Sequence, residues 1–177
     1  SEVEPYPRNR AVTDGVLSKR VIGAGGYSFI DNSLYIELTG YRPLGNSMQN
    51  MLNVRYTQLP ELENTAVYLR VAKEFDFGWD TFTIGGLYFS GKMSGPGNLP
   101  NYEFDDFSVD AFYSRDRGDH HFVISANFLT ESLDTSEYQK GGLASQDDNR
   151  LNRYRFSTSY IYKKHYEGLY CVGCESF

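Results

Sequence analysis

The amino-acid sequence predicts an all-β protein, an antiparallel up-and-down β-barrel of about eight strands of the transmembrane type. Aromatic residues make up 16% of the 177 residues and there are 17 glycines, a composition that favours strands and tight turns. Apolar and polar residues alternate with a period of two in six segments. Short connections also alternate with long polar ones, as the hairpins of such a barrel require.

The chain has the length of one domain. Residues 1–16 contain Pro5 and Pro7 and show no periodicity, which predicts an extended N-terminal arm. Residues 17–177 are predicted to form the barrel domain.

The alternation is clear in residues 33–42, where Leu34, Ile36 and Leu38 share one face of the predicted strand. It recurs in residues 66–74, 82–88, 104–114, 122–131 and 153–162. Weaker candidates are residues 21–30, 51–59 and 168–174. Bacterial single-chain barrels usually have an even number of strands, so we expect eight, with one weak segment as a loop. A helical spacing would place charged residues inside each apolar stripe, and we expect little helix.

Tight turns are predicted at residues 76–80, 115–119 and 163–168, each of which contains Gly or Asp. Long connections are predicted at residues 91–103 and 132–149. This alternation puts all tight turns at one end of the strands, the layout of outer-membrane barrels. Aromatic residues near strand ends would form the interfacial girdles; these are Tyr27, Phe29, Phe75, Phe77, Trp79, Tyr102, Phe104, Tyr160, Tyr162 and Tyr166. The alternative is that they form the core of a soluble β-protein.

Several classes of function are disfavoured by the sequence. No apolar run approaches the roughly 20 residues that a membrane-spanning helix needs. The net charge of -6 argues against nucleic acid as a partner. No Ser/His/Asp set and no ordered carboxylate pair indicates catalysis, so we expect a protein that is not an enzyme.

The polar face of the predicted strands carries both acids and bases. In a membrane barrel this face would line the lumen, as an ion-paired plug if the barrel has eight strands and as a pore lining if it is larger. The predicted lumen-facing residues are Glu37, Arg70, Glu74, Asp106, Asp110, Glu131, Arg153 and Arg155.

Cys171 and Cys174 form a C-x-x-C motif, followed by Glu175 where haem attachment requires His. A disulfide or a pair of thiols is the favoured interpretation, with a metal or redox role and an unusual haem attachment as alternatives. The histidines are scattered, and the neighbours His120 and His121 would point to opposite faces of a strand. We therefore expect no metal site and no cofactor in this chain.

Four segments of residues 33–170 resemble a family of proteobacterial outer-membrane proteins whose genes accompany multihaem c-type cytochromes. These segments read SLYIELTGYRPL, VYLRVAKEFDFGWDTFTIGGLYFSG, FDDFSVDAFYSRDRGDHHFVISANFLTE and NRLNRYRFSTSYIYKKHYEGLY. The resemblance implies a porin-like barrel in the bacterial outer membrane that contacts lipid and sheathes a cytochrome for electron transfer. Any haem would then belong to the partner. Members of the family continue through further hairpins, so the strands seen here could be part of a larger barrel.

The sequence thus predicts an outer-membrane, porin-like or scaffold β-barrel. The alternative from another class is a soluble exported β-barrel that binds a small ligand in its interior.

Overall fold

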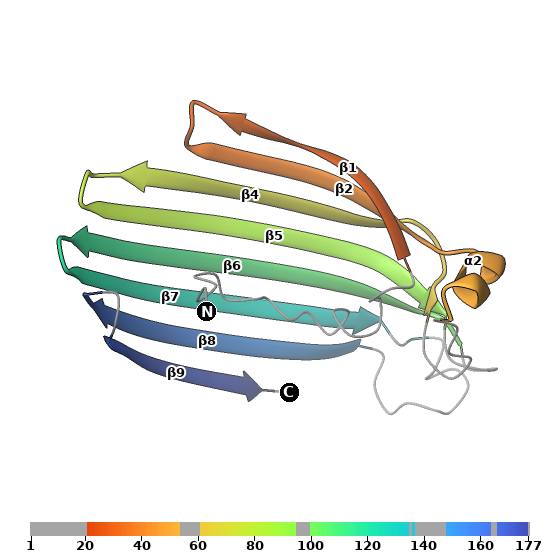
Figure 1. Ribbon diagram of the computed structural model, residues 1–177. Helices are drawn as coiled ribbons and strands as arrows, with labels where there is room; N and C mark the ends of the chain where they lie inside the picture. The colour runs from red at the N-terminus through yellow and green to blue at the C-terminus, as the bar shows by residue number, and fades with distance from the viewer. Residues whose placement is uncertain are drawn as a thin grey trace.

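The computed structural model describes residues 21–53, 61–94, 100–134, 136, 148–163 and 166–176. Its framework is one antiparallel sheet in which eight strands follow one another in chain order (Figure 1). These strands are β1 (Val21–Ile30), β2 (Leu34–Pro43), β4 (Ala66–Asp76), β5 (Asp80–Ser94), β6 (Tyr102–Arg117), β7 (His120–Asp134), β8 (Asp148–Tyr162) and β9 (Tyr166–Ser176). A two-residue strand, β3 (Glu61–Leu62), pairs with β5. The all-β class and the eight-stranded meander are confirmed.

The prediction that these eight strands close into a barrel is wrong for this structure. β1 pairs with β2 and β9 pairs with β8, and within the described residues the two edges do not pair with each other. A physical reason lies in the side chains between the edges. An eight-stranded barrel has room only for the side chains of its own wall. Here Leu62 of β3 packs against the same face as Phe89 and Phe104, so that face must also accommodate a ninth segment.

Two of the three weak strand candidates are confirmed, since residues 21–30 form β1 and residues 168–174 lie within β9. The third is wrong where it begins: Met51 ends a short helix, α2 (Asn46–Met51), and residues 54–59 lie outside the described chain. The buried Gln49 donates its amide to the Leu44 carbonyl oxygen at 2.7 Å, a local side-chain contact that periodicity does not reveal. Within the described ranges, no helix is long and apolar enough to cross a membrane.

The predicted tight turns are confirmed in position, with positive φ at Gly78, Gly118 and Lys163. The third is shorter than predicted because β9 already begins at Tyr166, and residues 164–165 lie outside the described chain. A fourth hairpin turn, at Asp31 and Asn32, was not predicted, although both residue types tolerate positive φ. All four turns lie at one end of the sheet, and α2 lies at the other (Figure 1). The long connections are shorter than predicted because β5 continues to Ser94 and β7 to Asp134. The predicted arm, residues 1–16, lies outside the described chain.

The sheet has two faces of opposite character. We call the face that carries Arg70, Phe89 and Asp106 the inner face, because most of the buried side chains of the strands lie on it. Its apolar part is a cluster formed by Leu62, Ala66, Phe89, Met93 and Phe104. We call the opposite face the outer face. It carries the apolar rows that begin at Leu34, Val67, Phe82 and Phe107.

The glycines at positions 23, 25 and 26 lie in the edge strand β1. A side chain at Gly25 would collide with the backbone oxygen of Leu38 and with Thr39, and one at Gly23 would lie 2.7 Å from the Tyr41 ring. These glycines therefore permit close approach of β1 to β2.

Candidate functional site

The register of the sheet puts all eight predicted lumen-facing residues on the inner face. Glu37 lies opposite Arg70, and Asp106 lies opposite Glu131. The other four share this face because side chains separated by an even number of residues on one strand point the same way. These residues are Glu74, Asp110, Arg153 and Arg155. Asp106 and Glu131 are buried, and Glu74 and Arg155 are exposed. That this face lines a lumen remains a prediction.

An ion pair crosses the middle of the inner face. Arg70 on β4 donates to Asp110 Oδ2 on β6 at 3.2 Å, although β5 lies between these strands. The bridge passes over Gly85, which lies opposite Asp110. A Cβ atom at Gly85 would come within 2.9 Å of the same carboxylate oxygen. Gly85 thus leaves the space through which the two charges meet, a role the sequence pattern did not signal.

Polar side chains extend this pair in both directions. Glu37 accepts hydrogen bonds from the hydroxyl groups of Tyr35 at 2.7 Å and Thr39 at 3.1 Å. On β7 the buried Asn127 donates to Ser108 Oγ at 2.8 Å. The inner face therefore carries a band of hydrogen-bonded polar groups beside its apolar cluster.

The outer face is apolar and exposed across its middle. Leu38 is 57% exposed, and Leu69, Val71, Ile84, Phe107 and Phe156 are exposed as well. On the described strands, Lys73 is the one charged residue in this band, and its ammonium group donates to Ser33 Oγ in the β1–β2 turn at 2.6 Å. We call this surface the apolar band.

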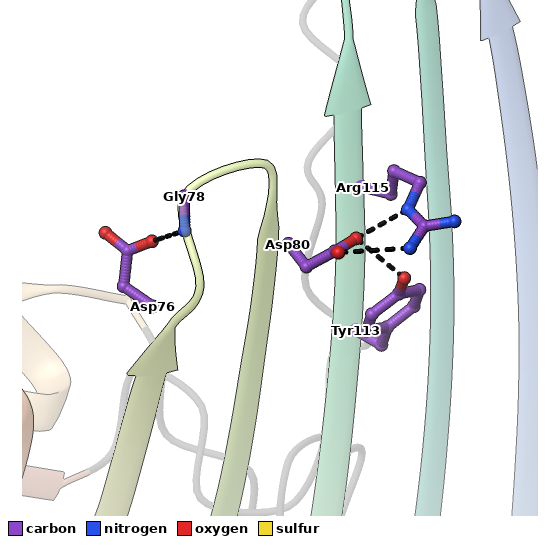
Figure 2. Close-up of polar contacts among 5 residues, drawn as sticks. All are labelled: Asp76, Gly78, Asp80, Tyr113 and Arg115. Atoms are coloured by element: carbon purple, nitrogen blue, oxygen red, sulfur yellow. Dashed lines mark hydrogen bonds and ion pairs between the residues drawn. The ribbon is translucent and has the colours of Figure 1, made fainter.

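A tyrosine–aspartate contact marks each end of the band. At the long-loop end Tyr88 donates its hydroxyl to Asp105 at 2.6 Å. At the tight-turn end Asp80 accepts hydrogen bonds from Tyr113 at 2.8 Å and from both Nε and Nη2 of Arg115, at 2.6 and 3.0 Å (Figure 2). The nearby turn is closed by the Gly78 amide, which donates to Asp76 at 2.7 Å (Figure 2).

These contacts give the band a measurable height. Asp105 and Arg115 lie ten residues apart on β6, which corresponds to about 34 Å along an antiparallel strand. If the strands had the tilt of roughly 40° found in membrane barrels, this length would correspond to a height of about 26 Å, against the ~25 Å apolar band of outer-membrane proteins.

Asp80 lies beyond the tight-turn end of the band, and Arg115 and Tyr113 hold its pKa below the ordinary value. A lowered folded-state pKa stabilises the fold above the unfolded-state pKa of Asp, and this contribution is lost as the pH falls through the folded-state pKa. We therefore expect Asp80→Asn to destabilise the protein at neutral pH and to make little difference in acid. Denaturant midpoints at both pH values measure this, with the exposed Asp116→Asn as control. A wild-type advantage that persists in acid would contradict the assignment.

The aromatic residues predicted for a girdle divide between the two faces of the sheet, and an interfacial role for them remains a prediction. Phe77 and Trp79 lie in the β4–β5 turn and are 70% and 67% exposed. Phe75 stacks on Phe82 nearby, and the His120 ring lies against Tyr160 and Tyr162. In contrast, the register assigns Tyr27, Phe29, Tyr102 and Phe104 to the inner face, and Phe104 is part of the apolar cluster. These four aromatics were assigned to the girdle because they lie near strand ends. The face on which each side chain lies is instead set by the alternation of side chains along the strand. The Tyr166 side chain lies outside the description.

The remaining motifs do not converge on a chemical centre. His120 Nδ1 lies 2.6 Å from the Tyr160 hydroxyl, and His121 Nδ1 lies 3.8 Å from Asp116. Cys171 and Cys174 occupy β9 positions opposite Ser157 and Tyr154, and their pairing as a disulfide remains a prediction. Among the residues that the structure describes, no group of three His, Cys, Asp or Glu side chains could hold a metal ion.

None of three comparisons, with protein-family models, with curated proteins and with solved structures, returned a match for this chain, and the family resemblance stated above remains a prediction.

Proposed function

We propose that this chain forms the wall of a porin-like β-barrel in a bacterial outer membrane and is not an enzyme. Its outer face would contact lipid, and its inner face would line the lumen. The observation that carries the proposal is the exposed apolar band, about 26 Å high at the strand tilt of such barrels and bounded at both ends by tyrosine–aspartate contacts. Monomeric soluble proteins rarely leave so large an apolar surface uncovered.

Among the described residues β1 and β9 form the two edges of the sheet, and the β1 edge bears on the size of the barrel. Soluble proteins protect edge strands with charges, Pro or bulges, whereas β1 reads VIGAGGYSFI and has neither a charge nor a proline. An unprotected edge of this kind suits pairing with another strand. We infer that strands beyond these eight complete a larger barrel, in which Arg70, Asp110 and their neighbours line a pore.

Trp79 provides a direct test because it is the only tryptophan in the chain. Reconstituted into lipid vesicles, Trp79 is expected to be quenched more strongly by lipids brominated near the headgroup than by lipids brominated near the chain ends. The reason is its place in an exposed turn just beyond the apolar band.

Matched variants sharpen the test. In a Trp79→Phe background, Val109→Trp, on the outer face near the middle of the band, should be quenched by deep bromines. Phe112→Trp on the same strand, but on the inner face, should not. Equal quenching of both, or a chain that stays monodisperse in plain buffer, would favour the soluble ligand-binding alternative.

A multihaem cytochrome is proposed as a partner on the family resemblance alone, and it would occupy the lumen. Co-purification of a haem-containing protein with the tagged chain from its native membrane tests this part separately. A colourless preparation from a cytochrome-producing cell would remove the cytochrome from the proposal and leave the barrel intact.

A further inference from the structure

Asp106 and Glu131 face each other on the inner face. They are directly opposed in the β6–β7 register, which puts their Cβ atoms about 5 Å apart. Asp106 is 0% exposed and Glu131 is 2% exposed, so water reaches neither side chain. Neither carboxylate oxygen of Asp106 accepts a hydrogen bond.

Among the described strand residues, no cation lies directly opposite Asp106 or Glu131 on the outer sides of the pair. β5 presents Phe89 opposite Asp106, and β8 presents Leu151 opposite Glu131. Two further charged residues adjoin the pair on the described strands: Asp105, which follows the opposite parity and accepts a hydrogen bond from Tyr88, and Arg153, which lies two residues beyond Leu151. Asp105 can only add repulsion, and Arg153 lies on the Glu131 side of the pair.

Two buried carboxylates side by side cannot both stay ionised, because burial and mutual repulsion each oppose the second charge. A proton between them removes one charge and supplies the missing donor. We propose that Asp106 and Glu131 form a carboxylic acid–carboxylate pair, a buried site that binds a single proton at neutral pH. This inference does not rest on the proposed function, because burial and register are the same whether lipid or water meets the outer face.

The pair predicts a specific linkage between pH and stability. The unfolded chain has lost both carboxyl protons at neutral pH, whereas the folded chain retains one. Unfolding therefore releases a proton, and the unfolding equilibrium constant should rise about tenfold per pH unit from neutral pH upward. The rise ends where the folded pair also loses its proton.

Infrared spectroscopy of the full chain in D₂O, in detergent or in buffer, tests the site directly. Wild type should show the carbonyl stretch of a protonated carboxyl group at neutral pH, and Asp106→Asn should lose it. Asp106→Asn should also resist denaturant better than wild type at alkaline pH. Asp105→Asn, the neighbouring residue of opposite parity, is the matched control and should keep the band.

Two outcomes would overturn the inference. One is a wild-type spectrum without a protonated carboxyl group, which can be read even if a variant fails to fold. The other is stabilisation by Ca²⁺ at neutral pH that Asp106→Asn abolishes, since the site would then hold a metal ion in place of the proton.

Discussion

Replacing Ile84 with arginine is expected to lower the unfolding free energy of the lipid-reconstituted protein by about 2–4 kcal/mol, the effect of a cation on the lipid face near the middle of a bilayer. Ile84 is 43% exposed and lies midway between Asp80 and Tyr88, the residues that mark the two ends of the apolar band. Denaturant titration in vesicles, followed by far-UV circular dichroism, measures the change.

The control for this substitution is the adjacent residue. Thr83 lies on the inner face opposite Glu74, so Thr83→Arg adds the same charge where a carboxylate can receive it. We expect it to be tolerated. If the outer face meets water, Ile84→Arg should shift stability by no more than about 0.5 kcal/mol, as surface substitutions usually do, and the lipid-facing assignment would be refuted.

The second large effect is expected at Gly85. Gly85→Ala would displace the Asp110 carboxylate from Arg70 and leave two partly buried charges without their contact. A charged hydrogen bond of this kind contributes about 1.5–3 kcal/mol. We therefore expect a net loss of about 1–2 kcal/mol after the stabilisation that a Gly→Ala change brings to the unfolded state.

Gly86→Ala is the matched control for Gly85→Ala. Gly86 follows directly in β5 and faces outward, where a Cβ atom would come no closer than 3.9 Å to Ser108 O. It should be neutral or stabilising. In the Asp110→Ala background, Gly85→Ala should lose most of its effect because there is no carboxylate left to displace. Additive losses would show that Gly85 acts by another route.

Periodicity was a good guide to strands and faces. The alternation that begins at Leu34 and recurs at Phe122 predicted which residues share a face, and the register agrees. The turns at Gly78 and Gly118 were predicted from residue type, because glycine adopts positive φ without steric cost. Both signals are local, so a single sequence can carry them.

What the sequence could not supply depends on contacts between distant residues. Asp106 and Asp110 occupy equivalent positions in the alternation of β6. The register places Asp106 opposite Glu131, whereas Asp110 forms an ion pair with Arg70. Whether the edges of the sheet meet depends on how many side chains pack against its inner face. Leu62 is one of them, and its strand of two residues is too short to show a periodic pattern. The inward-facing Phe104 shows that distance from a strand end does not fix orientation.

The strands of the middle of the sheet are longer than the apolar band that they carry. β5 continues from Ser90 to Ser94, and Lys92 links its end to Glu63 and Glu103 through contacts of 3.7 and 4.0 Å. Four residues of strand correspond to about 13 Å. In a bilayer this extension would project beyond the headgroups as ordered strand. An approaching solute or partner protein would then contact the strands before it contacts lipid.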